Sequence, residues 1–103
     1  MKHTDRISVS TKTPPVIEID PSCSAVYVRF KQSAKVARTE SLTPRKASVL
    51  CTVDFDARGE VIGIELVGVK EFSIQTIVES LPEGVEHVDF RRARFMPAAS
   101  VPA

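Results

Sequence analysis

The chain has 103 residues, of which 43% are hydrophobic and 26% charged, a composition typical of a soluble globular domain and too apolar for global disorder. Fourteen Lys and Arg residues against thirteen Asp and Glu residues leave a formal net charge of +1, which excludes a global field that attracts nucleic acid or anionic membranes. No apolar run approaches the roughly 20 residues that span a bilayer, and the polar start has no signal-peptide core, so we expect a cytoplasmic protein that does not contact membranes.

Composition shifts divide the chain into three parts. Residues 1–15 are polar and end in a Pro-Pro pair, which predicts a flexible N-terminal arm. Residues 16–95 carry the periodic apolar patterns and are expected to form a single α+β domain. Residues 96–103 contain two prolines among small residues and are predicted to be a disordered tail.

Alternating apolar and polar residues predict the strands in chain order. Residues 16–20 and 25–30 alternate on either side of a Pro-Ser break and are expected to pair antiparallel. Residues 35–40 predict a weaker third strand. Residues 48–55 and 60–67 predict a central β-hairpin.

One helix and a last strand are predicted after the hairpin. Ser73 is a good N-cap, and apolar residues from Ile74 to Leu81 recur at helical spacing until Pro82 ends the pattern, which predicts a helix over 74–81. Residues 86–91 predict a final strand. The expected fold is therefore a small antiparallel β-sheet, a meander of four to six strands, with the C-terminal helix packed on one face.

The turn of the hairpin begins at Asp56 and ends at Gly59, residue types that accept backbone N–H bonds and tolerate positive φ. A three-residue bulged loop would place Asp54 opposite Ile62 and mix polar with apolar residues on one face. A four-residue loop would place Val53 opposite Ile62 and keep one apolar face, so we predict this register, with Cys51 opposite Ile64. Gly63 within the second strand indicates a bulge or a close backbone approach.

The same stretch also resembles a calcium loop. Asp54, Asp56, Gly59 and Glu65 lie at calcium-loop spacings. The fifth ligand position, however, is Arg58, whose cation would repel the ion, and the flanking residues have strand periodicity. We therefore predict a structural turn and no metal.

The two cysteines fit neither a metal site nor a disulfide. Cys23 and Cys51 lie far apart without a nearby histidine, which does not match zinc-ligand spacing. Cys51 lies in an apolar strand pattern and is expected to be a core residue, whereas Cys23 is expected to be a loop thiol. No cofactor is predicted.

Three motifs in chain order resemble a known family. They are Ala25-Val-Tyr-Val-Arg-Phe30, Val36-Ala-Arg-Thr-Glu40 and Val53-Asp-Phe-Asp-x-x-Gly-x-Val-Ile-Gly-Ile-Glu-Leu66. Over about residues 16 to 70 the chain resembles the uncharacterised prokaryotic family called domain of unknown function 2283. The long N-terminal arm, the longer tail after Leu81, and Phe55 in place of the family's tyrosine depart from its pattern.

That resemblance implies a small antiparallel sheet with an accompanying helix, and it implies no established activity. Some members are encoded beside small proteins that resemble toxin-type ribonucleases, which implies an antitoxin-like role as one interpretation.

The sequence is compatible with three classes of function. A small enzyme or metal-binding protein could use Asp54, Asp56 and Glu65. The only histidines, His3 and His87, lie apart from these residues in the sequence, and no nucleophile with an orienting base is visible. We therefore predict that the protein is not an enzyme. Nucleic-acid binding could use the basic cluster of Arg91, Arg92 and Arg94, with solvated arginines as the ordinary alternative.

The third class is a protein-interaction or homo-oligomerising module, and it is the function that we predict. Apolar residues on the second face of the sheet would form the interaction surface: Ala25, Tyr27, Leu50 and Val61. Uncovered strand edges can also pair with other chains. The expected partners are a second copy of the chain or a small partner protein.

Overall fold

The computed structural model describes residues 9, 13–32, 34–42, 49–82, 84–85 and 88–97. This part of the chain forms six strands and one α-helix: β1 (Val16–Asp20), β2 (Ala25–Arg29), β3 (Arg38–Leu42), β4 (Leu50–Phe55), β5 (Val61–Val67), α1 (Ile74–Ser80) and β6 (Arg94–Pro97). Short 3-10 helices lie at Pro21–Cys23 and Phe90–Arg92.

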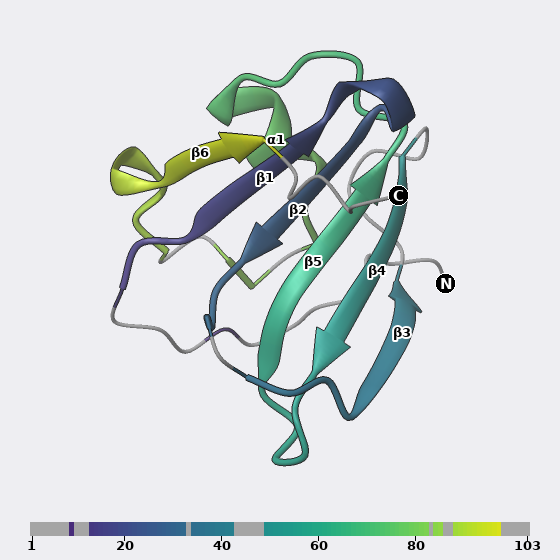
Figure 1. Cartoon of the computed structure of the whole chain (residues 1–103), viewed down its shortest axis with the longest axis vertical. Helices are drawn as coiled ribbons and strands as arrows, with labels where there is room; N and C mark the ends of the chain where they lie inside the picture. Colours follow the sequence, from purple (N-terminus) through teal and green to yellow (C-terminus); the bar gives the residue numbers. More distant parts are fainter. Residues whose placement is uncertain are drawn as a thin grey trace.

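The strands form one mixed sheet in the order β3-β4-β5-β2-β1-β6, with α1 behind the sheet (Figure 1). All neighbouring strands are antiparallel except β1 and β6, which are parallel. The α+β class is therefore confirmed, but two parts of the fold prediction are wrong. The sheet is not wholly antiparallel, and it is not a meander, because β2 pairs with β5 and not with β3.

The connection from β2 to β3 passes the turn end of the β4–β5 hairpin (Figure 1). The backbone N–H groups of Phe30 and Lys31 both donate to the Ile62 carbonyl, and Ala37 N–H donates to the Phe55 carbonyl. These bonds fix the connection to both strands of the hairpin. Because the chain must travel past the hairpin before it can pair with β4, β3 begins at Arg38 and not at residue 35 as predicted.

The hydrophobic core lies between the inner face of the sheet and α1. Ile17, Val28, Val53 and Ile64 are fully buried on the sheet, and Ile77 is fully buried on the helix. The core also contains Cys51, as predicted, and Val9, which belongs to the predicted N-terminal arm. The core therefore recruits a residue from a segment that was expected to lie outside the domain.

The predicted helix is confirmed. Ser73 is its N-cap, with the side-chain oxygen accepting from Thr76 N–H at 3.2 Å, and the helix ends at Ser80, before Pro82. Pro82 cannot donate a helical backbone bond, so it marks the end as expected. With seven residues, α1 is far too short to cross a membrane, and the described part of the chain holds no other helix that could.

The end of the domain differs from the prediction. Residues 86 and 87 lie outside the described residues, and Phe90–Arg92 form a 3-10 helix, so the strand predicted over 86–91 is wrong where it can be compared. The last strand is β6, which extends into the predicted tail and pairs with β1. Arg94 N–H donates to the Pro15 carbonyl at 3.0 Å at the start of this pairing.

The hairpin register also differs from the prediction. Val53 lies opposite Ile64 and Cys51 opposite Leu66, and the register shifts between Asp54 and Phe55, so that Phe55 lies opposite Val61. Ile62 is the extra residue of this β-bulge. Both predicted pairs, Val53 with Ile62 and Cys51 with Ile64, are wrong.

The loop length explains the register. Gly59 N–H donates to the Asp56 carbonyl, Asp56 N–H donates to the Glu60 carbonyl, and Gly59 has φ +82°, so the loop has three residues and not four. An uninterrupted strand after a three-residue loop would place Asp54 opposite Ile62 and so put polar and apolar residues on the same face. The extra residue Ile62 shifts the pairing of the rest of β5 by one residue, so that Asp54 lies opposite Gly63 and Val53 opposite Ile64, and the apolar residues share one face.

Candidate interaction surface

The outer face of the sheet, which points away from α1, carries a tyrosine that spans one strand. Tyr27 on β2 donates from its hydroxyl to Asp54 Oδ2 on β4 at 2.8 Å, although β5 lies between these strands. The tyrosine ring lies over Gly63 of β5, where a Cβ atom would come within 3.0 Å of the ring. The absence of a side chain at Gly63 therefore allows the crossing.

Further polar contacts extend from this bond across the outer face. Thr39 on β3 donates to Asp54 Oδ1 at 2.6 Å. On the other side, the Arg29 guanidinium lies 4.8 Å from the centroid of the Tyr27 ring and forms an ion pair with Glu18 on β1, with Nε and Oε2 3.0 Å apart. The contacts thus link strands from β3 to β1, and we call these five residues the outer-face network.

The outer-face network keeps the Tyr27 phenol protonated. Burial raises the pKa of Tyr27, and the hydrogen bond to Asp54 and the charge of that carboxylate raise it further. A tyrosine whose pKa is raised stays protonated at neutral pH and is a poor nucleophile or base. In the described residues, no buried side-chain nitrogen or oxygen lacks a hydrogen-bond partner.

The predicted interaction surface is only partly where the sequence placed it. Val61 is buried in the core at 2% exposure, because the bulge turns it inward, so its expected outer-face position is wrong. Tyr27 is half-buried in the outer-face network. Ala25 is also half-buried, whereas Leu50 is 71% exposed.

A smaller apolar row replaces the predicted surface. Val67 of β5 lies opposite Ala25 on one side and opposite Leu50 on the other, so the three residues line up across the outer face. Sequence reasoning missed Val67 because the predicted register was shifted by two residues and placed Leu50 opposite Glu65 instead of Val67.

The hairpin turn is built around Asp56. Its Oδ1 accepts from the backbone N–H groups of Arg58 and Glu60, each at 2.9 Å, and Lys31 Nζ lies 3.3 Å from Oδ2 and also bonds Glu60. The backbone bond from Glu60 is the main cause that lowers the pKa of Asp56, and Lys31 adds to it. Asp56 and Gly59 therefore act as the structural turn residues that were predicted.

The calcium-loop residues are not brought together as ligands. Asp54 accepts from Tyr27 and Thr39, whereas Asp56 accepts from its own turn and from Lys31. Glu65 is exposed on β5 opposite Thr52, and the flanks of the loop are strands. In the described ranges, no group of three or more His, Cys, Asp or Glu residues could hold a metal ion, and His3 and His87 lie outside those ranges.

Two strands form the edges of the sheet within the described part of the chain, and they differ in character. β6 is short, begins at Arg94 and ends at Pro97, features that protect an edge from pairing. β3 has five residues without proline, of which four are exposed and Leu42 is half-buried. Its Arg38 guanidinium lies 4.2 Å from the centroid of the Phe55 ring and pairs with Glu40, with Nε and Oε2 2.6 Å apart.

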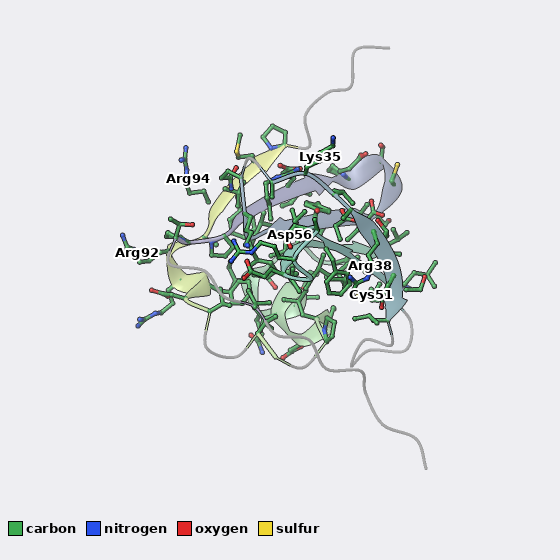
Figure 2. The ribbon with its side chains drawn as sticks, turned by 90° about the horizontal axis from the view of Figure 1, so that it is seen from below. Lys35, Arg38, Cys51, Asp56, Arg92 and Arg94 are labelled. Carbon is green, nitrogen blue, oxygen red and sulfur yellow. The ribbon has the colours of Figure 1, made fainter. Side chains whose placement is uncertain are left out.

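The basic cluster lies at the opposite edge. Arg91 pairs with Asp89 at 3.3 Å, whereas Arg92 and Arg94 are exposed and point away from the ribbon on the side of β6 (Figure 2). Phe95 is 44% exposed on the same strand. The three predicted arginines therefore lie near one another, but one of them already has an acidic partner.

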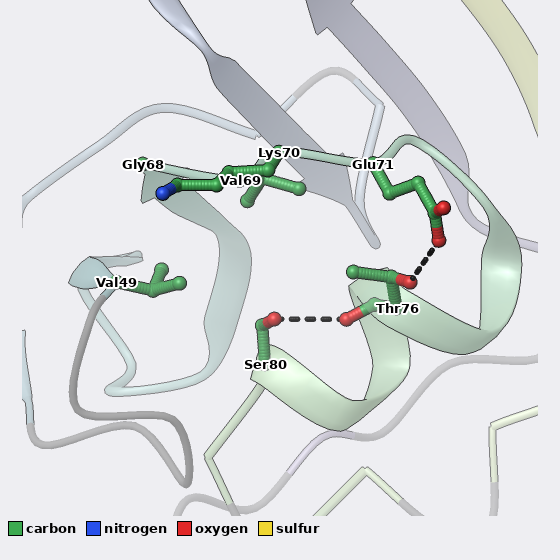
Figure 3. Close-up of a pocket in the computed structure, with 7 residues that line it drawn as sticks. All are labelled: Val49, Gly68, Val69, Lys70, Glu71, Thr76 and Ser80. Carbon is green, nitrogen blue, oxygen red and sulfur yellow. Dashed lines mark hydrogen bonds between the residues drawn. The ribbon is translucent and has the colours of Figure 1, made fainter.

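A pocket of about 300 Å³ lies between α1, the connection that follows β5, and Val49 (Figure 3). Its hydroxyl groups are engaged: Thr76 donates to Glu71 Oε1 at 3.1 Å, and Ser80 donates to the Thr76 carbonyl at 2.8 Å. Lys70 and Glu71 are exposed. Among the described lining residues, the Thr76 hydroxyl is therefore bonded to a carboxylate and the Ser80 hydroxyl to the helix backbone.

No family model matches this chain, and neither a curated protein nor a solved structure matches it.

Proposed function

We propose that this protein is a non-catalytic interaction module that assembles with a second copy or a small partner protein through an edge of its sheet. The observation that carries the proposal is the exposed outer edge of β3, which no described strand pairs. Backbone N–H and C=O groups on such an edge are ready to pair with another chain.

The placement of the polar side chains supports a non-catalytic role. The half-buried Asp54 and Tyr27 side chains bond one another, and the Asp56 carboxylate accepts from backbone groups of its own turn. A catalytic acid or base needs reach to a substrate, and these groups are already committed within the fold. The resemblance to domain of unknown function 2283, with the antitoxin-like role it implies, stays part of this proposal.

The test combines affinity capture from the native host with light scattering on the purified chain. The module predicts either a concentration-dependent mass above that of one chain or a small protein captured in a defined ratio. A chain that stays monomeric and captures no partner would contradict the proposal.

Nucleic-acid binding is a second candidate because Arg92 and Arg94 are exposed beside the partly exposed Phe95. Arginines next to an aromatic ring can hold single-stranded nucleic acid through phosphate contacts and stacking. Filter binding of a single-stranded oligonucleotide at low and moderate salt tests it. Salt-sensitive binding supports this candidate, and absent or salt-insensitive binding ends it.

A further inference from the structure

The exposed segment that contains β3 has a self-complementary sequence. It reads Val36-Ala-Arg-Thr-Glu-Ser-Leu42, with a basic residue two positions before an acidic one and an aliphatic residue at each end. If a second copy runs antiparallel with Thr39 opposite Thr39, then Arg38 lies opposite Glu40 twice. The next pairs are Ala37 with Ser41 and Val36 with Leu42.

From this pattern we infer that the chain forms a two-fold symmetric dimer in which β3 of one copy pairs with β3 of the second, joining the sheets edge to edge. The inference rests on the proposed function and names the partner as a second copy. A two-fold axis perpendicular to the sheet makes the two β3 strands antiparallel and keeps the inner faces of both sheets on the same side. Each inner-face side chain of one copy therefore lies opposite an inner-face side chain of the other.

The observed faces agree with this register. Arg38 and Glu40 lie opposite Phe55 and Val53 of β4, so both are on the inner side of β3. Thr39 lies opposite Asp54, on the outer side. The inferred pairing therefore sets opposite charges against each other on one side and two threonines on the other, which are favourable cross-strand pairs.

Other registers lose this complementarity. Centring the pair on Glu40 would place the two Glu40 side chains opposite each other and Arg38 opposite Leu42, and like charges directly opposite are unfavourable. The register centred on Thr39 also covers Val36, which is 48% exposed, with Leu42, which packs partly against the core. It thus combines two ion pairs with two apolar contacts.

The β3 edge fits a second copy better than the β6 edge does. β6 ends in proline and carries Arg94 next to Arg92, so two copies would bring like charges together. β3 carries one charge of each sign, and both side chains are about half exposed, at 52% and 45%. Because a single strand edge is a small interface, the dimer is expected to be reversible, with a dissociation constant in the micromolar range.

Charge reversal on the full chain tests the inference. Arg38→Glu makes both paired positions acidic and Glu40→Arg makes both basic, so each variant alone should dimerise at least about tenfold more weakly than wild type in sedimentation equilibrium. An equimolar mixture of the two variants restores both ion pairs. It should form a mixed dimer, detected by native mass spectrometry, with an affinity within about threefold of wild type.

The double variant Arg38→Glu/Glu40→Arg restores the same pairs within identical chains, so it should dimerise as wild type does. Two exposed sites away from β3 give matched controls for net charge, Arg58→Glu for the first variant and Glu65→Arg for the second. Both controls should leave the dissociation constant unchanged. Amide NMR spectra of every variant check that the fold is kept.

The outcomes separate this inference from the broader proposal. If wild type associates but the single reversals have no effect, the interaction module stands and the β3 dimer is wrong. The β3 dimer is also wrong if neither the mixture nor the double variant recovers association. A wild-type chain that stays monomeric at about 0.5 mM overturns the dimer, and capture of a small partner then decides the broader proposal.

Discussion

Tyr27 reaches Asp54 across an intervening strand, with 2.8 Å between the phenolic oxygen and the carboxylate. The crossing depends on Gly63, since a Cβ atom there would come within 3.0 Å of the tyrosine ring. A single glycine thus permits this arrangement of side chains on the outer face, where Thr39 donates to Asp54 and the Arg29 guanidinium lies over the Tyr27 ring.

Substitution of Gly63 by alanine is expected to lower the free energy of unfolding by about 1–3 kcal/mol, because the added methyl group displaces the Tyr27 ring. Urea unfolding measures the loss. In a double-mutant cycle with Tyr27→Ala, the two losses should be less than additive, since removing the ring removes the clash. Additive losses, or no loss for Gly63→Ala, would show that the ring does not lie over the glycine.

Tyr27 is the only tyrosine of the chain, so its ionisation can be followed directly by tyrosinate absorbance. The raised pKa predicts that the folded protein shows no tyrosinate at pH 10, where a free tyrosine is half ionised. Since the folded pKa lies above the unfolded value of 10.0, its stabilisation is present below pH 10 and is lost as the pH rises further.

Tyr27→Phe is the matched control for this pH dependence. It should lower the free energy of unfolding at neutral pH by about 0.5–1.5 kcal/mol through loss of the hydrogen bond to Asp54. It should also remove the extra loss of stability above pH 10. Ionisation of Tyr27 in the folded protein near pH 10 would count against the buried contact.

The contribution of Asp56 to stability depends on pH in the opposite direction, because its pKa is lowered. Its folded pKa lies below the usual value of 3.8, so its contribution is present above pH 3.8 and is lost as the pH falls through the folded pKa. Thermal unfolding of wild type and Asp56→Asn should therefore differ at neutral pH, and the difference should shrink in acid. A constant difference across this range would be inconsistent with a charged Asp56 in the turn.

Calcium provides a separate test of the Asp56 turn. Asp54 accepts from Tyr27, Asp56 accepts from its own turn, and Glu65 lies on β5 opposite Thr52, so the three carboxylates do not converge on one point. Millimolar calcium should therefore leave amide NMR spectra and the thermal midpoint unchanged. Sub-millimolar binding that is lost in Asp56→Asn would require a metal site at the hairpin instead.

Local patterns predicted the elements that are held by neighbouring residues. Alternation predicted the pairing of β1 with β2, and helical spacing with Ser73 as cap predicted α1, because each pattern lies within a short stretch. The β4–β5 hairpin was also predicted. Its register was not, because alternation assumes an uninterrupted strand, and the adjacent apolar residues Val61 and Ile62 marked the bulge that breaks it.

Long-range pairing was harder to predict. β6 pairs with β1 across almost the whole chain and contains only four residues, including a proline, so nothing local identifies it as a strand. The passage of the β2–β3 connection past the hairpin likewise depends on tertiary contacts, such as those of Lys31. Gly63 did give a usable signal, since a close approach at this glycine was expected, although the Tyr27 ring was not.

The nucleic-acid-binding candidate predicts a role for the exposed arginines at the β6 edge. Replacing Arg92 and Arg94 together by glutamate should abolish any low-salt binding of single-stranded oligonucleotides, because both exposed guanidinium groups are available to phosphates. Arg58→Glu is the control for charge at a distant exposed site. Binding by wild type that survives the double substitution would place nucleic-acid contacts elsewhere.

Sedimentation equilibrium over a range of concentrations measures self-association of the purified full chain. We predict a mass that rises with concentration from the 11.3 kDa of one chain toward twice that value, and in Glu40→Arg the same rise should need at least about tenfold higher concentration. A wild-type mass that stays at 11.3 kDa up to about 0.5 mM would contradict self-association through the β3 edge.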